Sequence, residues 1–150
     1  MQENKQYDKT QELTAELTLQ NDRMHFIGSV EGKPSISIDY IPPLGDNLGY
    51  TSLELLLLSL ASCFGSSLAV LLRRSGKTIT SLNLRALGKR RSTHPTGFER
   101  ITIYLELVSP DITIADVEKL IPLIEGSLCP VYSMIKGNVE LGYETNIRAV

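Results

Sequence analysis

Two cysteines carry the side chains best suited to chemistry in this sequence of 150 residues. Cys63 lies in the middle of the apolar segment 52–77, and Cys129 directly precedes Pro130. A thiolate is a nucleophile that can be oxidised to sulfenic acid and then joined to a second thiol as a disulfide. Because proline is favoured in the first turn of a helix, Cys129 is expected at a helix N-terminus, where the helix dipole favours a thiolate.

Each cysteine also has an ordinary structural interpretation. A buried free cysteine often serves only as a small apolar side chain, which is the simplest interpretation of Cys63. Cys129 can be no more than a small residue beside a helix cap. Their spacing in the sequence does not show that they are neighbours, so only the fold could bring them together.

The apolar segment predicts one long helix. Thr51 and Glu54 form a capping-box pattern at its start, and Gly76 suits a left-handed cap at its end. The stretch from Leu55 to Leu72 has no charge and is about long enough to cross a membrane, which takes roughly 18 to 20 residues. Its serines and the strand-forming segments on both sides favour instead a core helix buried on all faces, without a membrane partner.

The same helix predicts contact with a second copy of the chain. A helix that is apolar on every side needs more cover than one small sheet supplies. Small residues recur along it at Ala61, Gly65 and Ala69, where two backbones could approach closely. We therefore expect a homodimer; the alternative is that this stripe packs against another element of the same chain.

Strand patterns flank the helix on both sides. Alternation and turn residues indicate two or three antiparallel strands within residues 12–40, and a hairpin formed by residues 79–91 and 98–108. A last strand is expected over residues 138–147. Together with the helices, these strands predict an α+β fold in the order β-β-β-α-β-β-α-α-β.

Two shorter helices are expected before the last strand. Thr113 begins one that runs to about Leu128, with a kink or local break at Pro122. Pro130 begins the other. We expect residues 1–11 to be a flexible N-terminal arm and residues 12–150 to form a single domain.

Composition excludes several classes of protein. The chain is 42% hydrophobic and 21% charged, as in ordinary soluble domains, and its net charge of -2, without a basic block or a periodic stripe of lysine and arginine, argues against a nucleic-acid partner. The N-terminal segment has no secretion signal, which predicts a cytoplasmic protein. With only two cysteines and two isolated histidines, neither a disulfide scaffold nor a metal site is expected.

Two motifs, taken in order, resemble a known family. "SLELLLLSLASCF" at residues 52–64 and "SLCPVYSMIKG" at residues 127–137, followed by a terminal strand, are similar to the osmotically inducible protein C and organic hydroperoxide resistance proteins. The resemblance extends from about residue 12 to 147. It implies an OsmC-like fold in which antiparallel sheets wrap around a long buried central helix. It also implies an intertwined homodimer with a pair of thiols at the subunit interface.

The resemblance also implies a reaction. Cys63 would attack a peroxide and become sulfenic acid, and Cys129 would then form an intramolecular disulfide with it. A dithiol reductant, a lipoyl-bearing or thioredoxin-like protein, would reduce the disulfide, with no metal or organic cofactor. The apolar surroundings favour alkyl or fatty-acid hydroperoxides over hydrogen peroxide as the small apolar substrate.

The family further uses an arginine that holds the peroxide and a glutamate that positions it. Arg23 is the candidate arginine, although it can also be an exposed turn residue. At the place expected for the glutamate the chain has Leu53, and Glu54 follows one position later. One step along a helix turns a side chain by about 100°. Glu54 therefore either reaches the arginine from another angle or serves only the helix cap.

Two functions follow from these residues. The first is thiol-dependent reduction of organic hydroperoxides through a sulfenic acid and disulfide cycle. The alternative is a dimeric module of the same fold that binds a small apolar ligand or senses redox state with little peroxidase turnover. The displaced glutamate favours the second.

Overall fold

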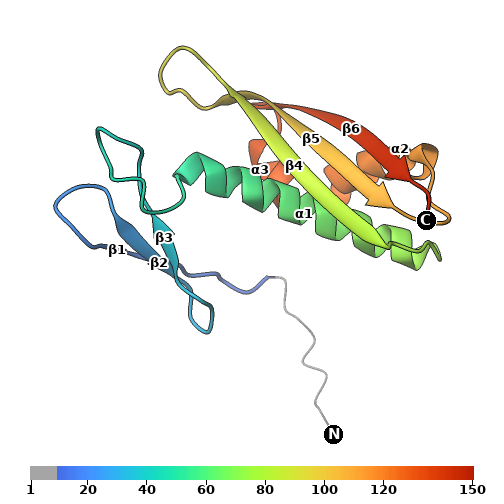
Figure 1. Cartoon of the computed structure of the whole chain (residues 1–150), viewed down its shortest axis with the longest axis horizontal. Helices are drawn as coiled ribbons and strands as arrows, with labels where there is room; N and C mark the ends of the chain where they lie inside the picture. The colour runs from blue at the N-terminus through green and yellow to red at the C-terminus, as the bar shows by residue number, and fades with distance from the viewer. Residues whose placement is uncertain (1–9) are drawn as a thin grey trace, which may run out of the picture. The chain divides into compact units, whose positions relative to one another are not determined.

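The computed structural model describes residues 10–150, so most of the N-terminal arm predicted for residues 1–11 lies outside the described residues. The chain divides into two compact units, one that ends at Ser52 and one that spans Leu53–Val150. Figure 1 shows the order of the elements, which is the predicted order β-β-β-α-β-β-α-α-β with a π-helical turn added between the last two helices.

The first unit contains a three-stranded antiparallel sheet, as predicted. Its strands are β1 (Glu16–Leu19), β2 (Phe26–Ser29) and β3 (Ile36–Ile38), with β2 in the centre. The loop after β3 is held by Asp39, which is buried and whose carboxylate accepts backbone N–H groups of Tyr40, Asp46 and Leu48. One buried carboxylate thereby orders a loop rich in proline and glycine.

The second unit contains a mixed sheet of β4 (Ser81–Arg90), β5 (Phe98–Val108) and β6 (Glu140–Arg148). β4 and β5 form the predicted antiparallel hairpin, whereas β6 pairs with β5 in parallel. The prediction of wholly antiparallel sheets is therefore wrong for β6. The reason is that the helices between β5 and β6 form a crossover, which carries the chain back to the end of the sheet where β5 began.

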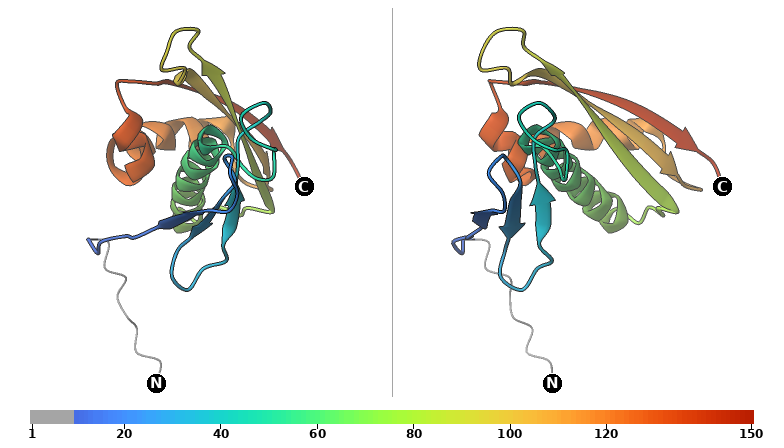
Figure 2. Two further views of the ribbon diagram at one scale, coloured as in Figure 1. Left: turned by 90° about the vertical axis from the view of Figure 1, so that its left-hand side faces the viewer. Right: turned by 60° about the vertical axis from the view of Figure 1, so that its left-hand side comes forward.

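The central helix α1 (Ser52–Arg74) packs on this sheet through one face. Figure 2 shows all the helices of the second unit on one side of the sheet. The buried face of α1 presents Leu60, Phe64, Gly65, Leu68 and Leu72. A helix residue that recurs every third or fourth position lies on one face, which is why this stripe forms the core.

Gly65 decides which element the small-residue stripe meets. A Cβ atom at this position would lie 2.9 Å from Cδ1 of Leu84 on β4, closer than side chains pack. Gly65 therefore lets α1 approach its own sheet. At Gly65 the small-residue stripe therefore packs against an element of the same chain, which was the alternative interpretation. The interpretation that the stripe packs against a second copy is wrong at this residue.

The other side of α1 is open within a single chain. Leu58 is 54% exposed and Val70 is 44% exposed, so the expectation of burial on all faces is not met by the chain alone. Among the described residues α1 alone is long and apolar enough to cross a membrane, by length and composition. Its packed face nevertheless forms the core of the second unit.

The ends of the helices agree with their sequence signals. Gly76 has a φ of 77°, and Gly76 and Lys77 donate their N–H groups to Arg73 and Leu72, which completes the predicted left-handed cap of α1. Thr113 caps α2 (Ile114–Leu123) in a capping box with Asp116. Both caps are thus confirmed.

The predicted break near Pro122 appears as a change of helix type. After α2 the chain forms the π-helical turn η1 (Ile124–Leu128), closed by a 2.9 Å hydrogen bond from the N–H of Cys129 to Ile124 O. Helix α3 (Pro130–Ile135) then begins at Pro130, as predicted. Cys129 takes an extended conformation with φ -101° and ψ 96°, which is typical of a residue that precedes proline.

Candidate functional site

The fold brings the two thiols together. Both cysteines are free, and the side chain of Cys63 on α1 is a hydrogen-bond partner of Cys129, which lies between η1 and α3. Cys129 belongs to the buried core cluster, and Cys63 packs against that cluster from a half-buried position. Cys63 is thus the more exposed of the two thiols.

Cys129 is held as a neutral thiol. Its side chain is 3% exposed, and burial together with the neighbouring Cys63 raises its pKa from 9.0 to about 11. The N–H of Tyr132, which donates to Cys129 Sγ at 3.4 Å, acts in the opposite direction, as does the N–H of Val131. The predicted influence of the helix end is therefore present, but burial outweighs it, and the pKa of Cys129 lies above its ordinary value.

A carboxylate and a phenol lie beside the thiols. Tyr143 of β6 donates its hydroxyl to Glu125 Oε1 at 2.6 Å, and its ring lies 4.9 Å from the ring of Phe64. Burial and the hydrogen bond to Glu125 raise the pKa of Tyr143, and the charges of Tyr132 and Cys129 raise it further. Burial, and then the charge of Glu125, also raise the pKa of Tyr132. These groups form one half-buried cluster with the thiols.

Sequence reasoning missed Glu125 and Tyr143. Glu125 precedes Cys129 by one helical turn, which was a usable signal because side chains at that spacing are neighbours. Tyr143 occupies an inward position of β6 opposite Ile103. No local pattern links Tyr143 to Glu125, because their contact depends on how the crossover returns to the sheet.

Arg23 lies in the first unit, whereas both cysteines lie in the second. Its guanidinium donates to Asp46 Oδ1, to Pro43 O and, at 3.0 Å, to Gly45 O. These contacts fasten Arg23 to the loop that follows β3. The interpretation of Arg23 as a turn residue thus has a visible structural basis, and its role toward a peroxide stays a prediction.

Glu54 lies in the first turn of α1 and is exposed, and Leu53 beside it is half-buried. A carboxylate in the first turn stabilises a helix through its dipole. That effect accounts for Glu54 without a catalytic role, and its action on an arginine stays a prediction.

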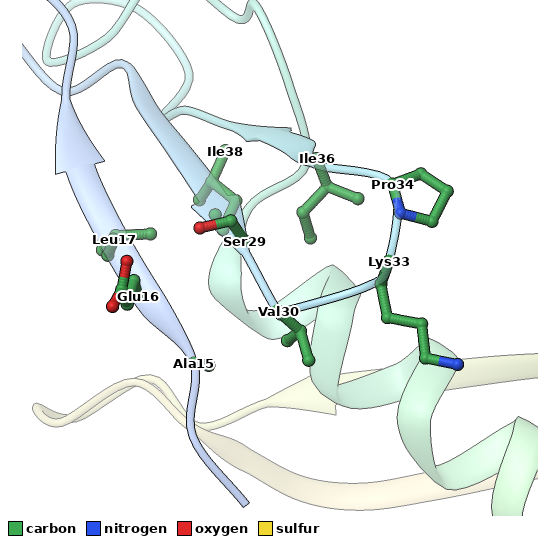
Figure 3. A pocket seen from close by; sticks show the side chains of 10 residues that line it. Ala15, Glu16, Leu17, Ser29, Val30, Lys33, Pro34, Ile36 and Ile38 are labelled. Carbon is green, nitrogen blue, oxygen red and sulfur yellow. The ribbon is translucent and has the colours of Figure 1, made fainter.

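The first unit also carries an apolar hollow of about 360 Å³. Figure 3 shows the side chains that line it, among them Leu17 from β1 and Ile36 and Ile38 from β3. Glu16 and Lys33 supply charged groups to its lining. The hollow is an uncovered apolar face of the first sheet. In the part of the chain that the structure describes, no cluster of three or more metal-binding side chains occurs.

Known proteins resemble this chain in sequence pattern and in structure. The sequence pattern of the family described as "OsmC-like protein" matches residues 45–144, and no curated protein gives a match. A hypothetical protein from Aquifex aeolicus VF5 has a similar structure, with a TM-score of 0.80 and 24% identity over 93% of this chain and 98% of that one.

Two further solved structures carry functional or family names. An OsmC-like protein from Mycoplasma pneumoniae has a TM-score of 0.75 and 20% identity over 94% of this chain and 99% of that one. An organic hydroperoxide resistance protein from Elizabethkingia anophelis has a TM-score of 0.71 and 19% identity over 95% of this chain and 100% of that one. At these identities the structures establish the shared fold, and the family pattern spans both thiols. The chain therefore belongs to the OsmC-like protein family.

Proposed function

We propose that this protein reduces organic hydroperoxides through a cycle of its two thiols. The observation that carries the proposal is the contact between half-buried Cys63 and buried Cys129. Membership of the OsmC-like family supports a peroxide-related redox role, since solved relatives from Elizabethkingia anophelis and Legionella pneumophila are named organic hydroperoxide resistance proteins.

The first step takes place at Cys63. Its thiolate attacks the terminal oxygen of a hydroperoxide, the O–O bond breaks, and the leaving alkoxide takes up a proton to become an alcohol. Cys63 is then a sulfenic acid. The greater exposure of Cys63 suits this role, because the peroxide must reach the attacking sulfur.

The second and third steps use Cys129 and a reductant. Cys129 attacks the sulfenic sulfur, the S–S bond forms and the S–O bond breaks, and the hydroxyl leaves as water with the proton of Cys129. A dithiol of the lipoyl or thioredoxin type then reduces the disulfide, which returns two thiols and oxidises the donor. No metal or organic cofactor enters these steps.

The apolar surroundings support an alkyl or fatty-acid hydroperoxide as substrate. Leu56, Leu57 and Phe64 lie near Cys63 in sequence on α1 and belong to the core or pack against it. Each methylene that leaves water contributes about 0.8 kcal/mol, so a chain of several carbons gains affinity that hydrogen peroxide lacks. Arg23 would hold the peroxide and Glu54 would orient Arg23.

Self-association is part of the same proposal. Leu58 and Val70 leave an apolar strip of α1 uncovered, and the first sheet leaves the apolar hollow around Ile36 uncovered. Exposed apolar surfaces of this kind are typical of interfaces. A second copy of the chain would cover both, and the homodimer would work in the cytoplasm.

A second function has its own support. Leu53 stands at the place expected for the family's glutamate, and Arg23 is already bonded by Asp46 and two carbonyl groups. Both features weaken peroxide activation. A module of the same fold that binds a small apolar ligand or senses redox state is therefore the alternative.

Intact-mass analysis of the reduced protein distinguishes the peroxidase from the binding or redox-sensing module. Brief exposure to equimolar cumene hydroperoxide is expected to form a Cys63–Cys129 disulfide, found by peptide mapping, faster than hydrogen peroxide does. Thiols that stay reduced, or that oxidise without pairing, would exclude the peroxidase and leave the binding module.

A further inference from the structure

We propose that Arg90, Arg91 and Lys136, with the exposed side chain of Met134, form a docking surface for an acidic protein that carries the reducing dithiol. We call these four residues the basic surface. The inference rests on the proposed thiol cycle and deepens its last step, because it concerns the surface on which the reductant approaches. None of the four residues belongs to the thiol site itself.

The end of β4 and the loop that follows it carry two guanidinium groups that are held in place. Arg90 donates its Nε–H to Thr96 O at 2.7 Å and its Nη2 to Thr96 Oγ1. Arg91 Nη2 donates to the backbone O of Asn138 at 2.6 Å and to its Oδ1 at 3.2 Å. All of these acceptors are uncharged. Both arginines are therefore positioned by the fold and keep their full positive charge.

The contact of Arg91 brings the end of α3 to the same place. Asn138 lies in the turn between α3 and β6, and Lys136 precedes it by two residues, so their Cα atoms lie within roughly 8 Å of each other. Figure 1 shows the hairpin loop and α3 toward the same end of the second unit. Lys136 is exposed, and Met134 is 77% exposed. Arginine and methionine are both enriched in protein interfaces.

The charges of the basic surface are not neutralised by the chain. On the adjacent strand positions Lys89 pairs with Glu99 at 2.7 Å, and Arg100 pairs with Glu140 at 2.6 Å. Within residues 10–150, by contrast, the three cations of the basic surface form no ion pair. An exposed group of uncompensated cations attracts a negatively charged partner and speeds its association.

The simplest alternative is a solvated hairpin tip without a partner. Cations on such a tip are free to turn, and ordering them opposes binding. Here the fixed guanidinium groups of Arg90 and Arg91 have already lost that freedom on folding. A partner that meets them loses less side-chain entropy, which favours a docking surface over a solvated tip.

The basic surface lies close to the thiols along the chain. Cys129 directly precedes α3 and Lys136 directly follows it, and a helix of six residues is about 9 Å long. A protein partner of ordinary size covers about 800 Å², roughly 30 Å across. An acidic carrier that is docked on the basic surface therefore extends far enough to present its dithiol to the Cys63–Cys129 bond.

The chemistry that the docked partner performs is thiol–disulfide exchange. A thiolate of the donor attacks one sulfur of the disulfide, the S–S bond breaks, and the released cysteine takes up a proton. The second thiol of the donor then attacks the mixed disulfide, which releases the other cysteine and leaves the donor as a disulfide.

Reduction kinetics test the docking surface. Diamide, which takes up two electrons and two thiol protons, prepares the disulfide without peroxide, and a dihydrolipoyl domain of negative net charge reduces it. The rate constant of the wild type should fall as salt is added. Lys136→Glu should be about fivefold slower at low ionic strength and less sensitive to salt. Dithiothreitol, a small uncharged dithiol, should reduce both proteins equally fast.

A matched control separates docking from net charge. Lys119→Glu makes the same change of charge at an exposed site on α2 and should behave as the wild type does. An unchanged rate in Lys136→Glu, equal slowing in Lys119→Glu, or equal slowing with dithiothreitol would overturn the inference. If Lys136→Glu does not fold, Arg91→Gln removes one charge, keeps a donor for Asn138 and must slow the reaction about twofold.

Fluorescence anisotropy of the labelled lipoyl domain gives a second readout, on the reduced protein. Lys136→Glu should weaken binding about fivefold. Tighter binding of a short DNA duplex or of phosphatidylserine vesicles would assign the basic surface to another polyanion and contradict the inference. If diamide forms no Cys63–Cys129 bond, the proposed thiol cycle fails, while the anisotropy measurement still decides whether the basic surface binds an acidic protein.

Discussion

The thiol of Cys63 contacts the thiol of Cys129, and this contact joins the central helix to the segment that follows the crossover helix. The two residues differ in exposure, since Cys63 is half-buried and Cys129 is buried. In the proposed cycle, this difference in exposure matches the different tasks of the two sulfur atoms.

Replacement of each cysteine separates those tasks. Cys63→Ser should abolish peroxide consumption, because the attacking sulfur is gone. Cys129→Ser should still consume one equivalent of cumene hydroperoxide and leave Cys63 as a sulfenic acid that dimedone captures. Mass spectrometry of the dimedone adduct is the measurement. If Cys63→Ser stays active, or if the adduct forms on Cys129, the assignment is reversed or excluded.

Arg23 can be tested against its structural partner. Arg23→Gln should slow the reaction of Cys63 with peroxide more than tenfold if the arginine holds the substrate, since charge-assisted contacts are strong. Asp46→Asn loosens the same loop contact and is the control. Stopped-flow oxidation rates, compared with thermal melting curves, distinguish a role of Arg23 in holding the peroxide from a role in fastening the loop. Equal small effects in both variants would assign Arg23 to the loop alone.

The local signals in the sequence predicted the fold better than they predicted the site. Thr113, Gly76 and Pro130 define helix ends through contacts with their own neighbours, and all three behave as predicted. The direction of β6 was not readable, because parallel pairing depends on the path of the whole crossover. In the site, too, local features could be predicted and contacts between distant segments could not.

The pairing of Cys63 with Cys129 came from a family resemblance, since the spacing alone left it open. The contact between Glu125 and Tyr143 had no sequence signal, because it joins a helical turn to a strand. The pKa of Cys129 could not be predicted from the helix end alone, because a helix end is a local feature, whereas the burial that outweighs it is a property of the folded core.

Asp116 makes stability depend on pH. The N–H and hydroxyl of Thr113 each donate to its carboxylate at 2.8 Å, and Lys77 Nζ lies 3.0 Å away. The N–H of Thr113 is the largest cause that lowers the pKa of Asp116 from 3.8 to about 2. A depressed pKa stabilises the fold above the ordinary value, and that contribution is lost as pH falls from 3.8 to about 2.

Asp116→Asn should therefore lower the melting temperature near neutral pH, and the difference from the wild type should shrink as the pH falls through that range. Glu118→Gln on the same helix is the control and should melt as the wild type does at each pH. A difference that persists undiminished at the acid end would show that the carboxylate charge is not what stabilises the cap.

Gly65 should be intolerant of a larger side chain. Gly65→Ala places a methyl group 2.9 Å from Leu84 Cδ1, and such overpacking typically costs 1 to 3 kcal/mol, against a gain of about 1 kcal/mol in helix propensity. We expect a net loss of about 1 kcal/mol in the free energy of unfolding, measured by urea titration. Gly126→Ala, where no atom lies within 4 Å of the new methyl group, should cause no such loss.

The uncovered strip of α1 predicts the oligomeric state. Leu58 is 54% exposed and apolar, and Leu87 on β4 is 53% exposed, so the two offer matched sites for a charge. The wild type should be dimeric by light scattering at micromolar concentration. Leu58→Glu should give a monomer, because an unpaired carboxylate in an apolar interface is strongly unfavourable, whereas Leu87→Glu should stay dimeric. A monomeric wild type, or a dimer unaffected by Leu58→Glu, would show that another surface, or none, joins two copies.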